Sequence, residues 1–297
     1  MELCLGTVQF GMDYGIIGQK KPSTEYAVRC LDYATQNGIS AIDTAEAYGT
    51  AEEIVGKFLC KKTIAREKLF LSTKLLPNCL DDTHPKKYGK VIRDKLCNSL
   101  SLLHTDYVDA FLLHSPHYVF NPQIMEALSN VKKEGLARKT GVSIYDPKEA
   151  FACYENKNVE FIQAPYSIFD QRMKERGVLD SDKKQGVEIH TRSAFIQGLI
   201  TLQEQQIPVF LQKARPIIQK VESICSETGI SRVELAMAYV KREKAISHLV
   251  FGIDSLEQLK EDIYYFQRDV SEDLLYRIQR EFKGLDADIV MPSLWKK

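Results

Sequence analysis

The sequence lacks the features that mark several large classes of protein. Its 297 residues contain no run of about 18 consecutive apolar residues, and no basic segment followed by an apolar one stands near the first residue. Neither a membrane span nor a secretory signal is therefore predicted. Basic and acidic residues number 40 each, and without a basic excess a nucleic acid is not an expected partner. We expect a cytoplasmic protein that binds neither membrane nor nucleic acid.

The cysteines and histidines also lack informative spacing. The seven cysteines include no Cys-x-x-Cys pair, and the six histidines include no His-x-x-x-His pair. An odd number of scattered cysteines is typical of reduced thiols in a reducing compartment. The sequence therefore predicts no disulfide framework and no metal site.

What the sequence does contain is an alternation of short apolar runs with longer segments of helical period. The runs predict strands at 3–8, 41–44, 69–73, 107–113, 140–144, 161–164, 187–193 and 248–253. Helices are expected at 24–37, 51–59, 86–103, 123–134, 147–155, within the mixed segment 172–185, and at 208–228, 232–241, 256–266 and 272–282. Eight strand and helix units without a linker predict the α/β class, a closed (β/α)8 TIM barrel that forms one domain over residues 1–297.

Two nucleotide-binding signatures are missing from this pattern. Gly6 and Gly11 have the spacing of a Walker motif, but Met12 and Asp13 follow where Lys and Ser or Thr are required. No Gly-x-Gly-x-x-Gly turn is present, so a nucleotide would not be held in the Rossmann manner. A tight turn near the barrel mouth is the expected use of these glycines. Segment 192–215 is expected to form an excursion or lid over the mouth.

Four ionisable residues lie at or close to the ends of the apolar runs: Asp43, Tyr48, Lys74 and His114. In a (β/α)8 barrel the C-terminal ends of the strands carry the catalytic groups. A carboxylate, a phenol, an ammonium and an imidazole in one site can protonate a carbonyl oxygen. Each residue alone also fits a structural interpretation, such as a helix cap or a half-buried aromatic. A reductase is the hypothesis that uses all four.

Ordered motifs over nearly the whole chain resemble the aldo-keto reductase family. They are Leu5-Gly6-Thr7, Asp43-Thr44-Ala45 with Tyr48-Gly49, Ser72-Thr73-Lys74, Thr105-Asp106-Tyr107-Val108-Asp109 leading to Leu113-His114, Gly141-Val142-Ser143, Gln163 and Gln197-Gly198-Leu199. The resemblance implies a (β/α)8 barrel that reduces a small-molecule aldehyde or ketone with a nicotinamide cofactor. It implies that Tyr48 is the general acid, that Lys74 favours its phenolate, that Asp43 holds Lys74 charged, and that His114 orients the carbonyl or shares the proton transfer.

The resemblance also implies a set of cofactor contacts, namely Gly6, Thr7, Ser143, Gln163, Arg192, Gly198, Gly252, Ser255 and Gln258. Ser143 and Gln163 correspond to residues that bind the carboxamide, whereas Ile144 stands where the family has Asn. Arg192 replaces an aromatic residue that stacks on the nicotinamide. Its planar guanidinium can also stack on a ring, and an ion pair at the barrel mouth is the alternative.

The site for the adenosine 2′-phosphate departs furthest from the family. Gly252 and Gln258 stand where better-studied members have Lys and Arg, and Asp254 and Asp262 add negative charge. Backbone N–H groups where the helix at 256–266 begins are expected to be available to anionic oxygens. NADPH is the cofactor expected from the family, with NADH as the alternative.

The substrate pocket and the assembly are less constrained. Phe10, Tyr14, Tyr118 and Phe120 fall in predicted mouth loops and are candidates for an apolar pocket, with packing as the alternative. We expect a monomer or a small homo-oligomer. A cofactor-binding regulatory or scaffold protein with little turnover is the rival hypothesis, because some members of the family have that role.

Overall fold

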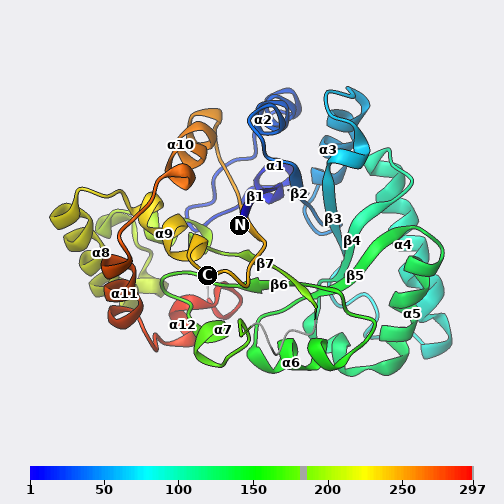
Figure 1. Cartoon of the computed structure of the whole chain (residues 1–297). Coiled ribbons are helices and arrows are strands. Elements are labelled where there is room, and N and C mark those ends of the chain that lie inside the picture. The colour runs from blue at the N-terminus through cyan, green and yellow to red at the C-terminus, as the bar shows by residue number, and fades with distance from the viewer. Residues whose placement is uncertain (181–185, 296–297) are drawn as a thin grey trace.

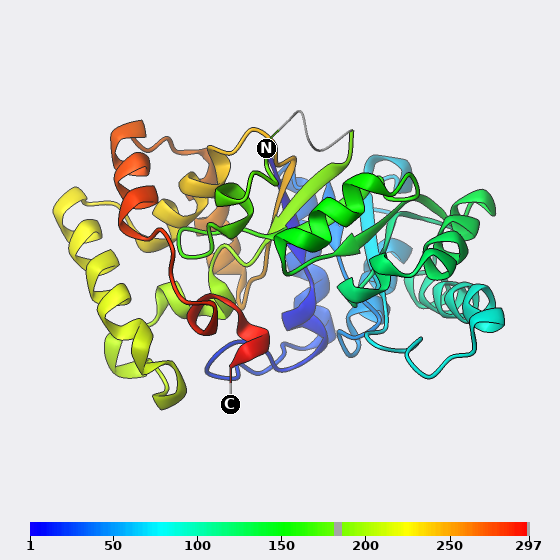
Figure 2. The ribbon, with the colours of Figure 1, turned by 90° about the horizontal axis from the view of Figure 1, so that it is seen from below.

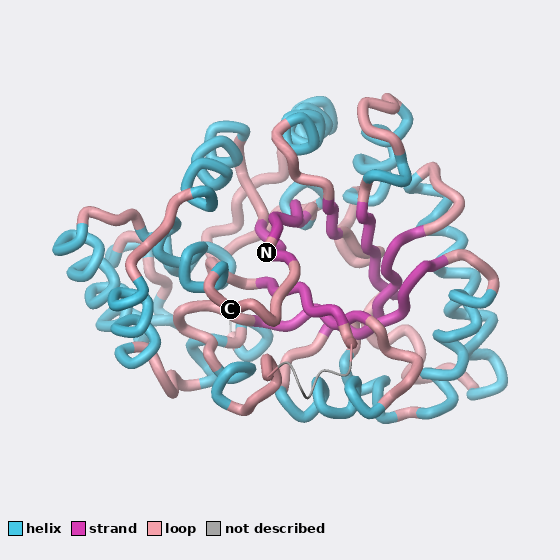
Figure 3. Tube along the Cα trace, in the orientation of Figure 1, coloured by secondary structure: helices cyan, strands magenta, loops and turns pink. Residues whose placement is uncertain are grey.

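The computed structural model describes residues 1–180 and 186–295 and has the predicted barrel at its centre. Eight parallel strands follow one another around a closed barrel in chain order, and the helices surround them (Figures 1 and 3). The strands are β1 (Glu2–Gly6), β2 (Ala41–Asp43), β3 (Phe70–Leu75), β4 (Val108–Leu113), β5 (Ala137–Ser143), β6 (Phe161–Pro165), β7 (Glu188–Arg192) and β8 (His248–Phe251). The prediction of a single (β/α)8 barrel is confirmed.

The longer helices match the segments of helical period. They are α2 (Thr24–Gln36), α3 (Ala51–Cys60), α4 (Tyr88–Leu103), α5 (Pro122–Lys133), α6 (Pro147–Glu155), α8 (Arg215–Thr228), α9 (Arg232–Lys241), α10 (Leu256–Gln267) and α11 (Glu272–Glu281). Helix α2 shows the local causes: Ser23 accepts a hydrogen bond from the Tyr26 amide at its start, and Gly38 has a φ of 88° just beyond its end. Three further helices of four residues are α1 (Val8–Gly11), α7 (Arg172–Glu175) and α12 (Ala287–Val290).

Several boundaries differ from the expectations. Strand β3 continues to Leu75, so Lys74 lies inside the strand rather than after it. The segment expected to begin a long helix at 208 is a 3-10 helix, Val209–Ala214, and α8 begins only at Arg215 with a proline in its first turn. Helix α7 is short because the chain turns at Gly177, whose φ is 74°. The helical end expected for this segment at 181–185 lies outside the described residues.

The excursion expected over residues 192–215 is present as irregular chain with three 3-10 segments: Ile196–Thr201, Glu204–Gln206 and Val209–Ala214. Positive φ values at Ser193, Ile196, Gln197 and Gly198 bend its first part sharply. That this segment acts as a lid stays a prediction.

Alternation along each strand decides which side chains enter the barrel. On β7, Glu188, His190 and Arg192 share one face, with Glu188 at the N-terminal base and Arg192 at the C-terminal mouth. The N-terminus and the C-terminal segment lie at opposite ends of the barrel (Figure 2). Among the described residues, no helix combines the length and the apolar character that a membrane span requires.

Candidate active site

The structure brings the four predicted catalytic side chains together at the barrel mouth. Asp43 ends β2, Lys74 lies in β3, His114 follows β4, and Tyr48 stands in the loop between β2 and α3. Lys74 Nζ lies 2.7 Å from each carboxylate oxygen of Asp43, 2.9 Å from the carbonyl oxygen of Thr44 and 3.4 Å from the Tyr48 hydroxyl. The ammonium therefore bridges the carboxylate and the phenol.

The Asp43–Lys74 ion pair is buried and fully hydrogen-bonded. Lys74 is 0% exposed and Asp43 is 2% exposed. Besides the ammonium, Asp43 Oδ1 accepts hydrogen bonds from Ser72 Oγ and Gln163 Nε2, each at 2.8 Å. A buried pair is tolerated only when its remaining hydrogen-bonding capacity is met. Gln163 thus uses its amide nitrogen on Asp43, and its amide oxygen remains to accept a hydrogen bond from a carboxamide.

The pKa of the Tyr48 phenol shifts in the direction opposite to the one expected from a neighbouring Lys74. Burial, and then the charge of Asp43, raise the pKa of the Tyr48 phenol well above its ordinary value, while Arg192 acts in the opposite direction. Lys74 was expected to favour the phenolate. Its charge is offset by Asp43, which binds the ammonium through both oxygens. The phenol consequently keeps its proton at neutral pH, as a general acid must.

His114 is half-buried beside the phenol. The two rings meet edge to face, with their centroids 5.8 Å apart. Burial, followed by the charges of Lys74 and Arg192, lowers the pKa of His114 from 6.5 to about 3. The imidazole is therefore neutral at physiological pH, and its Nδ1 atom has no hydrogen-bond partner within the described part of the chain. A neutral imidazole can orient a carbonyl by hydrogen bonding but has no extra proton to donate.

These groups open into a cavity of about 340 Å³ that runs from Tyr48 and His114 to the start of α10. The predicted residues that line it are Gly6, Thr7, Tyr14, Asp43, Tyr48, His114, Gln163, Arg192, Gly198, Gly252 and Gln258. The cavity wall also includes residues that the sequence interpretation missed, among them Gln9, Gln19, Tyr145 and Phe195. The excursion after β7 supplies much of the wall beyond Arg192.

Several candidate residues lie elsewhere. Phe10 is 1% exposed and packs in the core. The Tyr118 hydroxyl donates to Asp81 at 2.8 Å and accepts from the Leu80 amide at 2.9 Å, so it braces the loop after β3 instead of lining the cavity. Phe120 is exposed on the surface. The pocket assignments of Phe10 and Tyr118 were therefore wrong, because loop aromatics face the core or neighbouring loops as readily as a site.

Two of the expected cofactor contacts also lie outside the cavity wall. Ser143 is buried at the end of β5, and Ser255 caps α10 by accepting a hydrogen bond from the Gln258 amide at 3.0 Å. Asp262 is likewise buried, on α10. Neither serine side chain thus contributes to the cavity surface described above.

Arg192 has a defined partner in Tyr145. The guanidinium carbon lies 4.4 Å from the centre of the Tyr145 ring, and Nη2 donates to the carbonyl oxygen of Ile144 at 2.9 Å. No carboxylate among the described residues forms an ion pair with Arg192, so the alternative of an ion pair at the mouth is not observed. The planar cation is held between the ends of β5 and β7 and faces the cavity. No sequence motif predicts the role of Tyr145, because its contact with Arg192 depends on how the ends of β5 and β7 are placed in the folded barrel.

The far end of the cavity carries no basic side chain among its described lining residues, but it carries Asp254. Asp254 Oδ2 accepts a hydrogen bond from Gln19 Nε2 at 3.1 Å, and its amide donates to Gln258 Oε1 at 2.8 Å. The Leu256 amide, expected to be available to an anion, instead donates to the Tyr26 hydroxyl at 2.9 Å. The helix start thus offers fewer free donors than the sequence suggested.

Gly11 and Gly49 allow the loop that carries Tyr48 to pack closely against the loop after β1, and we see no phosphate-binding role for Gly11 in this contact. A Cβ atom built on Gly11 would stand 1.7 Å from the carbonyl oxygen of Tyr48. Gly49, whose φ is 59°, lies against the same segment, and a Cβ atom on it would stand 2.4 Å from the carbonyl oxygen of Gly11. The Thr50 amide donates a hydrogen bond to that carbonyl at 3.2 Å. This close backbone approach requires glycine.

Comparison with known proteins agrees with the fold. A sequence profile described as the Aldo/keto reductase family matches residues 2–280. Protein tas of Escherichia coli is 27% identical over 333 aligned residues, which cover 93% of this chain and 92% of that protein. An NADH-specific methylglyoxal reductase of E. coli is 26% identical over 82% of this chain and 84% of its own length. The holo form of an aldo-keto reductase from Bacillus halodurans superposes with a TM-score of 0.76 at 22% identity, over 94% of this chain and 91% of that one. This chain therefore belongs to the aldo/keto reductase family and is an NAD(P)H-dependent oxidoreductase.

Proposed function

We propose that this protein reduces a small aldehyde or ketone with NADH in preference to NADPH, and that Tyr48 delivers the proton. The contact between Lys74 Nζ and the Tyr48 hydroxyl at 3.4 Å, beside the cavity that Tyr48 and His114 line, carries the assignment of Tyr48. A phenol that keeps its proton, a fixed cation beside it and a neutral imidazole form a site for a carbonyl oxygen that gains negative charge.

Each residue has a separate part in this reaction. A reduced nicotinamide, when bound, supplies the hydride that reaches the carbonyl carbon. Tyr48 gives its proton to the carbonyl oxygen as the C=O double bond becomes a C–O single bond. Lys74 then lies beside the phenolate that remains, until that phenolate takes a proton from water. His114 hydrogen-bonds the carbonyl oxygen and orients it.

The residues present fit a nicotinamide dinucleotide. At the catalytic end of the cavity, the amide oxygen of Gln163 can accept a hydrogen bond from the carboxamide, and the planar guanidinium of Arg192 can stack on the nicotinamide ring. At the other end Gly252 leaves room for the Gln9 side chain, because a Cβ atom there would stand 2.1 Å from Gln9 Oε1. The wall is continuous between the two ends. A dinucleotide lying along it would place its nicotinamide at Tyr48 and its adenosine half at α10.

The preference for NADH is inferred from Asp254. A carboxylate accepts hydrogen bonds from the ribose hydroxyls of NADH and repels the 2′-phosphate of NADPH. No Lys or Arg of the described cavity wall lies at that end to offset it. The E. coli relative whose name specifies NADH and methylglyoxal, at 26% identity, supports both the cofactor and a small carbonyl substrate.

The test of the catalytic assignment is Tyr48→Phe, assayed with NADH and a panel of aldehydes and ketones that includes methylglyoxal. We expect turnover to fall about 10²- to 10⁴-fold, the usual contribution of a general acid, while the Kd for NADH changes less than twofold. Tyr118→Phe is the matched control, because Tyr118 lies outside the cavity, and it should keep normal turnover. Equal turnover of Tyr48→Phe and the native protein would remove Tyr48 from the mechanism.

The cofactor preference is tested by kcat/KM with NADH and NADPH. We expect NADH to be favoured in the native protein, and the double variant Asp254→Asn, Gln258→Arg to shift the ratio toward NADPH by at least about tenfold, since a charged hydrogen bond is worth about 1.5–3 kcal/mol. A native preference for NADPH would overturn the cofactor proposal and leave carbonyl reduction intact.

The same assays address the rival hypothesis. Neither the comparisons nor the described residues favour a regulatory or scaffold protein. Tight binding of NADH without turnover of any carbonyl on a broad panel would nevertheless revive that hypothesis. The cytoplasmic location and the monomeric or small homo-oligomeric state stay predictions, the latter measurable by light scattering.

A further inference from the structure

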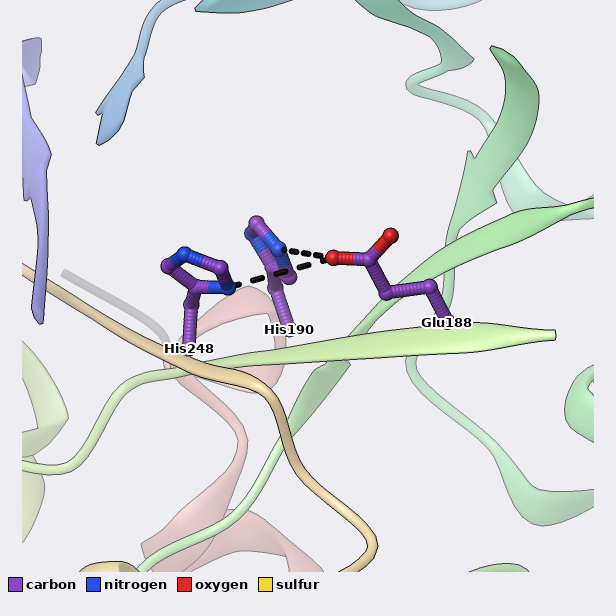
Figure 4. A group of neighbouring side chains, drawn as sticks. All are labelled: Glu188, His190 and His248. Atoms are coloured by element: carbon purple, nitrogen blue, oxygen red, sulfur yellow. Dashed lines mark hydrogen bonds and ion pairs between the residues drawn. The ribbon is translucent and has the colours of Figure 1, made fainter. Parts of the chain in front are cut away.

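A second cluster of polar side chains lies at the opposite end of the barrel from the active site. Glu188 and His190 project from one face of β7, and His248 projects from β8, where it is the register partner of His190. Figure 4 shows the three side chains converging, with one oxygen of Glu188 facing both imidazole rings. We propose that these three residues bind one divalent first-row transition metal ion, Zn²⁺ being the reference case.

The separations between the three ligand atoms are close to those of a metal site. His190 Nε2 lies 3.1 Å and His248 Nδ1 lies 3.9 Å from Glu188 Oε1, and the three atoms are all within 4.8 Å of one another. Zinc binds nitrogen and oxygen ligands at about 2.0–2.2 Å, which puts neighbouring ligand atoms roughly 3 to 4 Å apart. Small side-chain rotations would therefore bring all three atoms onto one ion.

The surroundings of the cluster resemble the outer shell of a metal site. His248 Nε2, the nitrogen that faces away from Glu188, lies 3.6 Å from a carboxylate oxygen of Glu2. Histidines that bind metals usually donate their second N–H to such a carboxylate. Ser247 Oγ lies 3.1 Å from both Glu188 Oε1 and His248 Nδ1, which provides one more oxygen beside the ion.

The ligands are held in place and are partly accessible. His190 is 0% exposed, and its ring lies 4.5 Å from that of Phe161 and 5.0 Å from that of Phe70, measured between centroids. The side chains of Glu188 and His248 are 22% and 14% exposed, so an ion can reach them from solvent. Burial lowers the pKa of both histidines, that of His248 to about 4, and leaves them neutral, the form that binds metals.

Two features bear on the affinity for the metal ion and on the effect of its binding. Lys139 forms an ion pair with the other oxygen of Glu188, so binding through Oε1 leaves this pair intact but places a positive charge near the ion. The site lies at the N-terminal end of the strands, and this end of a (β/α)8 barrel contributes stability rather than catalysis. Metal binding should therefore raise the stability of the protein without changing carbonyl reduction.

No sequence motif indicates this cluster. Glu188 and His190 are two positions apart on one strand, and His248 lies on the neighbouring strand much later in the chain. The familiar metal motifs place ligands one helical turn apart or in pairs on a tight loop. Strand pairing, which no local spacing reveals, brings these ligands together.

The test uses the full chain after treatment with EDTA, titrated with ZnCl₂ by calorimetry and with CoCl₂ by absorption. We expect one ion per chain with micromolar or tighter affinity, a Co²⁺ spectrum without the sulfur-to-metal charge-transfer band that cysteine ligands would give, and a rise of several degrees in Tm at saturating Zn²⁺. Turnover of the carbonyl substrate should stay unchanged.

Variants assign the binding to the cluster. Glu188→Gln and His248→Gln should each weaken binding at least tenfold, and Glu2→Gln about tenfold, as outer-shell changes usually do. His84→Gln, at an exposed histidine elsewhere, is the matched control and should bind normally. Lys139→Met removes the opposing charge and should tighten binding, a gain that a misfolded variant cannot show.

Three results would overturn the proposal. They are the absence of saturable binding to the native protein at any soluble Zn²⁺ concentration, undiminished binding in a folded His248→Gln variant, and a Co²⁺ spectrum dominated by thiolate ligands. If the Glu188 or His248 variant fails to fold, unchanged or weaker binding by Lys139→Met would overturn the proposal instead.

Discussion

Replacing Asp43 by Asn tests the electrostatic arrangement of the active site. The substitution preserves the shape of the side chain but removes its charge. One carboxylate oxygen becomes an NH₂ group that faces the ammonium of Lys74, which lies 2.7 Å from both oxygens, and at the Oδ1 position it would also face the donors of Ser72 and Gln163 at 2.8 Å. Lys74 is 0% exposed, so the variant leaves a cation in the interior without a counter-charge.

The expected loss of stability follows from this burial. Removing one partner of a buried ion pair costs about 3–5 kcal/mol, because the remaining charge is uncompensated. For a chain of 297 residues the entropy of unfolding is about 0.6 kcal/mol per kelvin. Asp43→Asn should therefore lower Tm by about 5–8 °C and shift the midpoint of urea unfolding at an unchanged m-value. Turnover should fall as well, because Lys74 loses its fixed position beside Tyr48.

The control is the double variant Asp43→Asn, Lys74→Met. Replacing both members of a buried pair with neutral groups is often close to neutral for stability, so the double variant should recover at least half of the loss while remaining inactive. Two results would contradict the reasoning. The first is a free energy of unfolding for Asp43→Asn that lies within about 1 kcal/mol of the native value, a smaller loss than expected. The second is a double variant that is no more stable than the single one.

Three further predictions concern other parts of the molecule. Burial lowers the pKa of His248 from 6.5 to about 4, so the unfolded chain gains a proton over that range before the folded one does. Acidification from pH 6.5 to 4 should therefore reduce the free energy of unfolding, and His248→Gln should make the loss shallower by up to about 1.4 kcal/mol per pH unit, measured by urea unfolding at several pH values. Burial raises the pKa of Asp262 from 3.8 to about 8, so stability falls as pH rises through that range, and Asp262→Asn should add about 1–3 kcal/mol at pH 8 but little at pH 4. Gly11→Ala would force its Cβ against the Tyr48 carbonyl and should reduce kcat up to about 10²-fold, whereas Gly89→Ala, in open space on α4, should leave kcat unchanged.

The fold could be predicted from the sequence because each strand is buried on both faces. Such strands appear as short apolar runs, and the covering helices show one apolar face, so the two patterns separate cleanly. The boundary of β3 was missed for a physical reason. Lys74 was read as the charged residue that follows the strand, yet it points into the barrel toward Asp43 of β2. A charged residue can continue a buried strand when its partner lies on the neighbouring strand.

Only those residues of the candidate site that belong to sequence motifs could be predicted. Asp43, Tyr48, Lys74 and His114 were identified in advance, and the structure brings them together. The neighbours that shape the cavity were not, because Tyr145 owes its position to the approach of β5 and β7. Tyr118 failed as a pocket residue for the converse reason, since an aromatic residue in a mouth loop can turn toward an adjacent loop and bond Asp81.

The two ends of the barrel are also coupled through charge. Burial lowers the pKa of His190, and Glu188 and then Asp43 act in the opposite direction. The negative charge of Asp43 at the mouth therefore favours the protonated form of His190 slightly. His190 is already neutral at physiological pH because burial lowers its pKa, so removing that charge provides no additional neutral imidazole, whereas it takes away a negative charge that favours a cation. Asp43→Asn should thus lose carbonyl reduction but keep its Zn²⁺ affinity or lose only a little of it, so that one variant separates the chemistry of the mouth from the binding proposed for the base.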